Sequence, residues 1–242
     1  MSDLQKRLAG EAAALRVEPG MVVGLGTGST AAWFVRALAA RDLSGLRCVP
    51  TSEKTADLAR ELGLPLAALD DVSRIDLTVD GADEVGPGLA LIKGGGAALL
   101  REKLVWEASD RCIVIADSAK VVPVLGAFPL PIEVVAFGHR STANRIMDVL
   151  ADHDIAMPAR LRQAAPQEAS LREASVGSQR LGVVRTDGGN VIYDAKCQAI
   201  HDPVRLADDL KLITGVVEHG LFLDLADEAI IGEDAGVRTL LP

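Results

Sequence analysis

Residues 75–103 read IDLTVDGADEVGPGLALIKGGGAALLREK, which predicts a strand, a glycine-rich loop and a helix in succession. The apolar run 75–79 is typical of a short buried strand. Asp80 and Asp83 then follow at the carboxyl end of that strand, where open α/β sheets bind their ligands. The three glycines at 94–96 let the backbone approach a ligand closely, and the helix predicted after them directs free N–H groups towards the same place.

Four ionisable side chains of this stretch can act together on a substrate. Lys93 stands directly before the glycines, and Glu102 follows them two helical turns later. A lysine and a helix N-terminus can stabilise negative charge that develops during a reaction, and carboxylates can remove and return protons. We therefore predict a catalytic site that contains Asp80, Asp83, Lys93 and Glu102.

A second strand, loop and helix lie nearer the N-terminus. Residues 21–25 have the pattern of a buried strand, and the Gly/Ser/Thr loop 26–30 separates them from a helix predicted over 31–40. Backbone amides and hydroxyls in such a loop can bind phosphate. The loop lacks the G-x-G-x-x-G spacing of dinucleotide sites and the Walker lysine, so a small phosphorylated ligand fits it better than NAD or ATP. A tight turn without a ligand is the alternative.

The first half of the chain alternates strands and helices. A helix is predicted over 3–17, and further strands over 47–50, 64–69 and 112–116. Lys120 follows the last of these strands on the ligand side of the sheet, and it is predicted to contact substrate. Thr51 or Ser52 is predicted to cap the next helix, with a role in lining the ligand site as the alternative.

Two prolines in residues 128–131 interrupt this alternation and predict a domain boundary. Beyond them a second region is predicted to have β-α-β-β-α-β order, with a hairpin between its second and third strands. Its expected elements are strand 132–137, helix 141–151, strands 181–185 and 191–194, helix 203–212 and strand 215–218. The tail strands 229–232 and 237–240 are expected to return to the first region. The predicted domains are therefore 1–127 with 221–242, and 128–220.

Composition limits the class of protein. The 242 residues carry a net charge of −9, which argues against nucleic acid as a partner. No uncharged run approaches the ~20 residues that a membrane span requires, and no signal peptide is evident, so we expect a cytoplasmic protein without membrane contact. Cys48, Cys112 and Cys197 are scattered without metal-ligand spacing and are predicted to be buried thiols.

Several motifs resemble the ribose-5-phosphate isomerase, type A, family, in the right order from end to end. The motifs are GLGTGST at 24–30, TSEKT at 51–55, DGADE at 80–84, KGGGAALLREK at 93–103, FPLP at 128–131, GNVI at 189–192 and GLF at 220–222. The resemblance implies an α/β protein with an open, Rossmann-like parallel sheet domain and a smaller α+β, ferredoxin-like domain. It further implies a homodimer or homotetramer without cofactor or metal that interconverts ribose 5-phosphate and ribulose 5-phosphate in the pentose phosphate pathway.

The resemblance also implies roles for individual residues. Glu102 matches the position of the catalytic base. The positions that match substrate contacts are Thr27, Gly28, Ser29, Thr30, Asp80, Gly81, Ala82, Asp83, Lys93, Gly94, Gly95, Gly96 and Lys120. Lys6 is a weaker match to a lysine that contacts phosphate. The polar stretch from about 160 to 180 matches poorly and is interpreted as an insertion.

Three other functions are alternatives to isomerisation. An amino-sugar phosphate deaminase requires an acid/base apparatus centred on histidine, and no such motif is found. A CoA-transferase-like protein shares the fold class. A sugar-phosphate sensor without catalytic activity is expected to carry a basic helix-turn-helix segment, which this sequence lacks.

Overall fold

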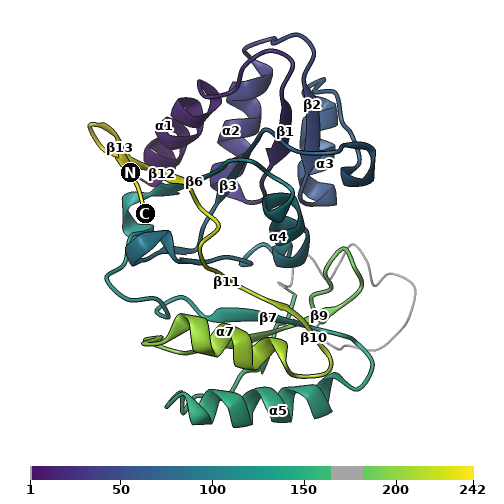
Figure 1. The fold of residues 1–242 in the computed structure, drawn as a ribbon, viewed down its shortest axis with the longest axis vertical. Helices are drawn as coiled ribbons and strands as arrows, with labels where there is room; N and C mark the ends of the chain where they lie inside the picture. Colours follow the sequence, from purple (N-terminus) through teal and green to yellow (C-terminus); the bar gives the residue numbers. More distant parts are fainter. Residues whose placement is uncertain (1, 165–181) are drawn as a thin grey trace.

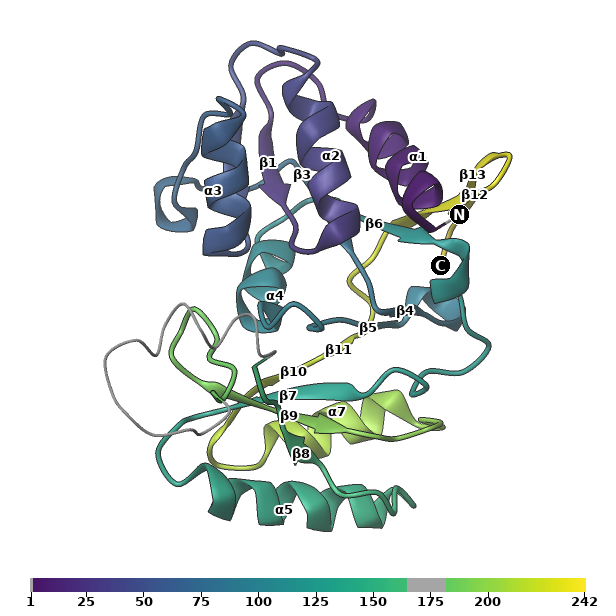
Figure 2. The same cartoon turned by 180° about the vertical axis from the view of Figure 1, so that it is seen from behind.

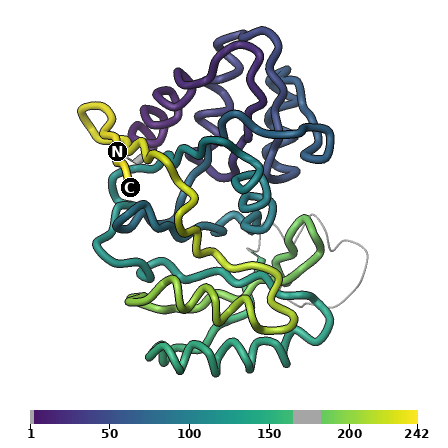
Figure 3. Tube along the Cα trace, viewed as in Figure 1, coloured from purple at the N-terminus to yellow at the C-terminus, as the bar shows by residue number. Residues whose placement is uncertain are grey.

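The computed structural model describes residues 2–164 and 182–242, drawn as a ribbon in Figure 1 and as a continuous tube in Figure 3. The described helices are α1 (Ser2–Ala14), α2 (Ser29–Ala39), α3 (Glu53–Glu61), α4 (Leu99–Glu107), α5 (His139–Asp152) and α7 (Pro203–Lys211). Short 3-10 helices are η1 (Leu69–Asp71), η2 (Pro87–Leu89) and η3 (Ser118–Lys120). Most of the stretch interpreted as an insertion lies outside the described residues.

The larger sheet confirms the predicted α/β class. Its strands are β1 (Val22–Leu25), β2 (Arg47–Pro50), β3 (Leu77–Gly81), β6 (Cys112–Asp117), β12 (Glu228–Glu233) and β13 (Gly236–Leu240). They lie in the order β13-β12-β6-β3-β1-β2, and every neighbouring pair is parallel except β12 and β13. The tail strands thus return to this sheet as predicted. All six residues of β6 are buried, as expected of a central parallel strand.

Helices α1, α2 and α3 cover one face of the larger sheet (Figure 1). Buried side chains such as Phe34 of α2 pack there against Leu25 and Val79. The other face is covered by α4 and by a small sheet, where Trp106 packs against Val114. Both faces are therefore buried at the central strands, whereas the edge strand β13 is mostly exposed, and the ends of the central strands are available for a site.

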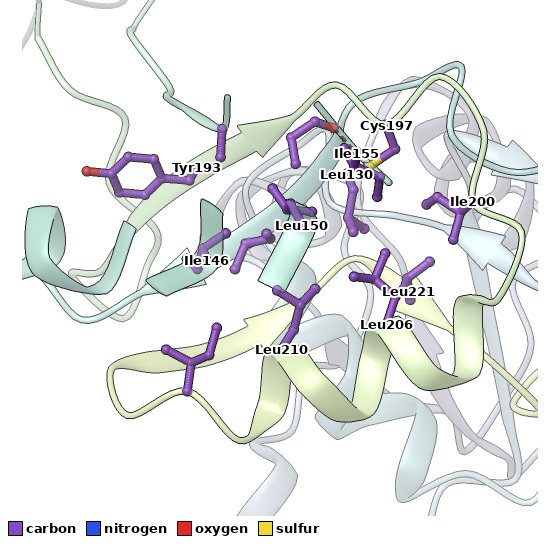
Figure 4. Close-up of a cluster of buried hydrophobic side chains, with 14 of the residues drawn as sticks. Leu130, Ile146, Leu150, Ile155, Tyr193, Cys197, Ile200, Leu206, Leu210 and Leu221 are labelled. Atoms are coloured by element: carbon purple, nitrogen blue, oxygen red, sulfur yellow. Dashed lines mark hydrogen bonds between the residues drawn. The ribbon is translucent and has the colours of Figure 1, made fainter. Parts of the chain in front are cut away.

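A second, antiparallel sheet lies below the first in Figure 2, with α5 and α7 beneath it. Its strands are β7 (Leu130–Val134), β8 (Arg160–Leu161), β9 (Val191–Ala195) and β10 (Val216–His219), in the order β10-β7-β9-β8. This is the expected β-α-β-β-α-β arrangement. Its apolar face packs on the two helices, where Leu130, Ile146 and Leu206 meet (Figure 4).

Three short strands connect the two sheets. They are β4 (Glu84–Val85), β5 (Leu91–Ile92) and β11 (Leu221–Phe222), in the order β11-β5-β4. Strand β11 is the continuation of β10 on its way back to the larger sheet. This small sheet therefore joins the glycine-rich loop after β5 to the segment that leaves the antiparallel sheet.

Two strand predictions are wrong. Residues 64–69 form only an isolated bridge between Leu66 and Cys48 before η1 begins, because Pro65 has no N–H with which to extend a ladder. In the second sheet, the described part of 181–185 makes isolated bridges, and β8 is the second strand instead. Only two residues long, β8 is too short to show an alternating pattern.

Other features agree with the sequence. Ser52 caps α3 by accepting a hydrogen bond from the Thr55 N–H at 3.1 Å. All three cysteines are free and buried. Among the described residues, no helix combines the length and the apolar character needed to cross a bilayer.

Candidate active site

A cavity of about 120 Å³ opens at the carboxyl ends of β1 and β3. From β1 the chain passes to β2 on one side and returns to β3 on the other, so the strand order reverses between β1 and β3. Open α/β sheets bind ligands at such a reversal. The cavity is lined by Lys6, Thr27, Gly28, Ser29, Thr30, Gly81, Ala82, Asp83, Lys93, Gly94, Gly95, Gly96, Glu102 and Lys120.

One part of the lining suits an anion. Ser29 and Thr30 form the first turn of α2, whose N-cap Gly28 provides no side chain to occupy the free amides. Lys6 on α1 donates a hydrogen bond to the Ser29 hydroxyl at 3.1 Å, and Lys120 brings a second ammonium to the same cavity. Hydroxyls, amides and two lysines are the groups that bind a phosphate.

A second part of the lining is a buried ion cluster centred on Lys93. Its Nζ lies 3.0 Å from Asp80 Oδ2 and 3.5 Å from Glu102 Oε1, and it donates to the Gly81 carbonyl at 2.5 Å. The same Nζ lies 5.4 Å from the Trp106 ring centroid and 5.3 Å from that of Phe222. An ammonium held over aromatic faces and between carboxylates stays charged although it is only 2% exposed.

The cluster changes the proton affinity of its members. Burial raises the pKa of Glu102 from 4.5 to about 8, and the Lys93 ammonium only partly opposes this. Burial likewise raises the pKa of Asp80. Burial would lower the pKa of Lys93, but the charges of Asp80 and Glu102 outweigh it and the pKa rises. One ammonium facing two carboxylates therefore leaves the cluster ready to bind a proton near neutral pH.

Glu102 is the member of the cluster that can exchange a proton with a ligand. Its Oε2 has no hydrogen-bond partner within the described part of the chain, and the residue lines the cavity. Asp80, by contrast, is completely buried behind the lining. Its Oδ1 accepts hydrogen bonds from the Thr27 and Gly81 N–H groups. A Cβ on Gly26 would lie 2.1 Å from that oxygen, so glycine is required there.

The glycine-rich turn brings further polar groups to the cavity. Gly94 has a φ of +104°, a conformation that L side chains rarely adopt, and the Gly95 N–H donates to Asp83 Oδ2 at 2.7 Å. Behind the turn, the guanidinium of Arg162 donates to the carbonyls of Gly94 and Gly95. The turn is therefore held from both sides.

Sequence and structure comparisons identify the family. A model of the ribose 5-phosphate isomerase A (phosphoriboisomerase A) family matches residues 47–236. A Caulobacter vibrioides protein named ribose-5-phosphate isomerase A is 65% identical over 241 residues, covering 100% of this chain and 99% of the relative. The chain belongs to the ribose 5-phosphate isomerase A family.

Solved structures of family members have the same fold. A D-ribose-5-phosphate isomerase in complex with phospho-erythronic acid superposes with a TM-score of 0.87 and 38% identity, covering 100% of both chains. Ribose 5-phosphate isomerase A from Neisseria gonorrhoeae superposes with a TM-score of 0.85 and 34% identity, covering 100% of this chain and 98% of the other. The similarity extends over both sheets.

The structure brings the predicted site residues of this family member together. All of them line the cavity except Asp80, which supports the lining from behind. The spacing predicted for Glu102 is wrong, because it lies in the first turn of α4 and not two turns beyond the glycines. Ala97 has a φ of +61° and the helix begins only at Leu99, so the turn is longer than the sequence indicated.

Polar residues near Thr27 support the site from outside the cavity. The Thr27 hydroxyl contacts the hydroxyls of Thr51, Ser52 and Thr55 at 2.7, 2.8 and 3.2 Å. None of these three lines the cavity among the residues that the structure describes. Capping and support are therefore their roles here, and the alternative of ligand lining is not supported.

Sequence reasoning missed Arg162, because its contact with the turn spans 67 and 68 residues of chain. Lys6, given only as a weak match, does line the cavity. Within the described ranges, no group of three or more His, Cys, Asp or Glu side chains is placed to hold a metal ion. No histidine belongs to the described lining of the cavity.

Proposed function

We propose that this protein interconverts ribose 5-phosphate and ribulose 5-phosphate through an enediolate, with Glu102 as the base. The observation that carries the proposal is a carboxylate of raised pKa beside a buried ammonium, in a cavity that suits a sugar phosphate. One oxygen of this carboxylate has no hydrogen-bond partner among the described residues. A base of this kind works best when its pKa lies near the working pH.

The proton moves between two carbon atoms of the open-chain sugar. Glu102 removes the proton from C2 of the aldose, and the electron pair of that C–H bond forms the C1–C2 double bond of the enediolate. Glu102 then returns the proton to C1, while the hydroxyl proton on O2 passes to O1, which yields the ketose. Both protons return to the sugar and no electrons leave it, so the reaction needs no external oxidant or reductant.

The oxyanion that develops on the substrate needs positive charge. The Lys93 ammonium lines the cavity and is held 3.5 Å from Glu102 Oε1, so it can face the same two carbons. The backbone amide of Gly96 adds a neutral donor. In a buried site such donors contribute more than they do in water, because little solvent screens them.

The remaining groups bind and prepare the substrate. The 5-phosphate is assigned to the first turn of α2 with Lys6 and Lys120. Asp83 lines the cavity and is held by the Gly95 amide, so we assign it to ring opening and hydroxyl proton transfer. Asp80 is assigned to holding Lys93 and the loop after β1 in place, rather than to direct contact with substrate.

The test is direct. The purified protein is incubated with ribose 5-phosphate in the presence of a chelator and without any added cofactor, and ribulose 5-phosphate is measured. We expect conversion to an equilibrium mixture from either direction. Binding of ribose 5-phosphate without conversion would instead indicate the sensor class, and release of ammonia from an amino-sugar phosphate would indicate a deaminase.

We also propose that the protein is a cytoplasmic homodimer or homotetramer with domains 1–127 plus 221–242 and 128–220. Supporting association, Phe137 and Leu212 are the most exposed large apolar side chains of the described chain, at 94% and 82%. Light scattering after size-exclusion chromatography measures the mass in solution. A mass of one chain at micromolar concentration would contradict the oligomer.

A further inference from the structure

Arg162 lies just beyond β8 and contacts the glycine-rich turn from the antiparallel sheet. Its Nη1 donates to the Gly94 carbonyl at 2.9 Å and to the Gly95 carbonyl at 3.2 Å. Its own backbone N–H donates to the Ile192 carbonyl on β9. Arg162 does not belong to the described lining of the cavity, so its observed contact with the site is the one through the turn.

Asp194 holds the Arg162 guanidinium in a fixed orientation. Arg162 Nε donates to Asp194 Oδ2 at 2.8 Å, and Nη2 donates to Asp194 Oδ1. The side chains are only 15% and 25% exposed. A two-point arginine–carboxylate contact fixes the plane of the guanidinium and leaves Nη1 directed at the turn.

Fixing two carbonyls also fixes two amides. A peptide unit is planar, so the carbonyl of one residue and the N–H of the next point in opposite directions. Because the Gly94 carbonyl accepts a hydrogen bond from Arg162, the Gly95 N–H faces Asp83 and donates a hydrogen bond to it. Because the Gly95 carbonyl accepts a hydrogen bond from Arg162, the Gly96 N–H is directed away from the antiparallel sheet. This N–H has no acceptor in the described part of the chain.

We propose that Arg162 is a positioning residue for the reaction, because it orients the Gly96 amide as an oxyanion donor and the Gly95 amide as the support of Asp83. This rests on the proposed isomerase function. The flexible turn needs such a contact, since glycine has more backbone freedom than any other residue. An amide rotated out of place gives no stabilisation when charge develops, although substrate can still bind.

The first test compares Arg162→Met with Arg145→Met. Arg145 also donates to a backbone carbonyl, that of Thr214 at 2.9 Å, but neither residue belongs to the described cavity lining. We expect Arg162→Met to lower kcat roughly 10- to 100-fold with KM changed less than about threefold. Arg145→Met should keep kcat, and Arg162→Lys should recover part of the loss because lysine can still donate to one carbonyl. A kcat for folded Arg162→Met equal to that of Arg145→Met would overturn the proposal.

A second test uses Asp194 and also applies if Arg162→Met does not fold. Asp194→Ala should lower kcat in the wild-type background. It should cause little further loss of kcat in an Arg162→Lys background, because Asp194 acts by holding the two-pronged guanidinium of arginine, which lysine lacks. An unchanged kcat in folded Asp194→Ala would overturn the proposal.

A third test does not depend on catalysis. Hydrogen exchange followed by mass spectrometry should show faster exchange of the amides at 94–97 in Arg162→Met, and no change there in Arg145→Met. Wild-type protein that fails to isomerise ribose 5-phosphate contradicts the isomerase function alone. Active wild type with unchanged exchange and unchanged kcat in Arg162→Met contradicts the role of Arg162 alone.

Discussion

Two buried lysine clusters lie side by side, and the neighbouring residues Glu102 and Lys103 of α4 belong to different ones. The Lys93 cluster comprises Lys93, Asp80 and Glu102 and faces the cavity. The Lys103 cluster comprises Lys103, Glu218 and Lys211 and joins α4 to the end of β10. Each has a buried lysine paired with a buried carboxylate, and only Lys211 is exposed, yet the hydrogen bonding of the two clusters differs.

The Lys103 cluster is fully satisfied. Lys103 Nζ donates to Glu218 at 2.7 Å, to the Leu221 carbonyl at 3.0 Å and to the His219 carbonyl at 3.3 Å. Glu218 also accepts from Lys211 and from the His219 N–H. Burial would raise the pKa of Glu218, but the Lys103 ammonium outweighs it and lowers the pKa to about 2.

The Lys93 cluster has the opposite character. Glu102 Oε2 lacks a partner among the described residues, and the pKa of this carboxyl is raised to about 8. The comparison teaches that burial alone does not make a carboxylate reactive. Glu102 has few hydrogen-bond donors around it and is therefore ready to exchange a proton. Glu218 accepts hydrogen bonds from several donors, which keep it ionised.

Replacing the reactive carboxylate should have the largest effect. Glu102→Gln keeps the size of the side chain but cannot accept a proton, so kcat should fall by roughly 10²–10⁴-fold. Exchange of solvent deuterium into ribulose 5-phosphate, which is acyclic, should be lost as well. Glu107→Gln on the exposed side of the same helix is the control and should keep both activities. Wild-type deuterium exchange in Glu102→Gln would remove Glu102 from the role of base.

The same substitution in each cluster should separate stability from catalysis. Lys103→Met leaves Glu218 buried without its main partner, and the free energy of unfolding should fall by about 3–5 kcal/mol. Lys93→Met also removes the charge that faces the developing oxyanion, so the folded fraction should lose roughly 10²-fold in kcat. Urea denaturation and activity per folded molecule measure the two effects. A larger loss of kcat in Lys103→Met than in Lys93→Met would contradict this assignment.

The raised pKa of Glu102 predicts a pH-dependent cost to stability. Between about pH 4.5 and 8 the folded protein binds a proton on Glu102 that the unfolded chain does not, so this contribution to stability is present below pH 4.5 and is lost as the pH rises to about 8. Glu102→Gln does not titrate. The unfolding free energy of Glu102→Gln minus that of wild type should therefore increase from pH 5 to 7.5, by up to about 1.4 kcal/mol per pH unit.

This prediction is measured by urea denaturation of both proteins across that pH range. Glu107→Gln on the exposed side of α4 is measured in the same way as the control for removing one carboxylate from this helix. A difference between Glu102→Gln and wild type that is independent of pH would mean that Glu102 has an ordinary pKa in the folded protein.

The smallest expected effect lies outside both clusters. Removing the hydroxyls at the start of α2 with a Ser29→Ala/Thr30→Ala double variant should raise KM roughly tenfold, because two hydrogen bonds to phosphate are lost, and change kcat less. Inorganic phosphate should inhibit wild type more strongly than this variant. An unchanged KM would place the phosphate elsewhere.

The local part of the candidate site could be located from the sequence. The apolar strand before Asp80, the glycines before α4 and the loop after β1 are contiguous signals, and the structure places the predicted residues around one cavity. The residue types in each contiguous segment and the expected order of the strands were sufficient to predict that these residues lie together. The positions of Asp80 and Asp83 show the limit, because Asp80 lies within β3 and is buried, whereas Asp83 lies beyond β3 and reaches the cavity.

Contacts between distant segments could not be predicted. The close approach of Gly26 to Asp80 and the contact of Arg162 with the turn depend on the packing of separate strands. The start of α4 at Leu99 also depends on the positive φ of Ala97, a residue that strongly favours helix by itself. Tertiary contacts override local preference in such places.

The segment from β10 to β11 has a consequence for synthesis of the protein. Every residue of the described cavity lining lies between positions 6 and 120. Yet the Gly220 carbonyl accepts the Lys93 N–H at 2.9 Å, and Glu218 and Leu221 hold Lys103 beside Glu102. A nascent chain that has emerged only to position 127 therefore holds the whole set of reactive side chains without the groups that hold them in place.

Activity should therefore appear late during translation, after both β11 and the tail strand β12 have been synthesised. A fragment released earlier, for example at position 215, carries Glu102 and Lys93 but lacks β11 and the tail strand β12 that pairs with β6. Chains of this size generally fold by domains as they emerge, and here the first region must wait for the last part of the chain. Premature termination anywhere in the second region thus yields an inactive product rather than a partly active one.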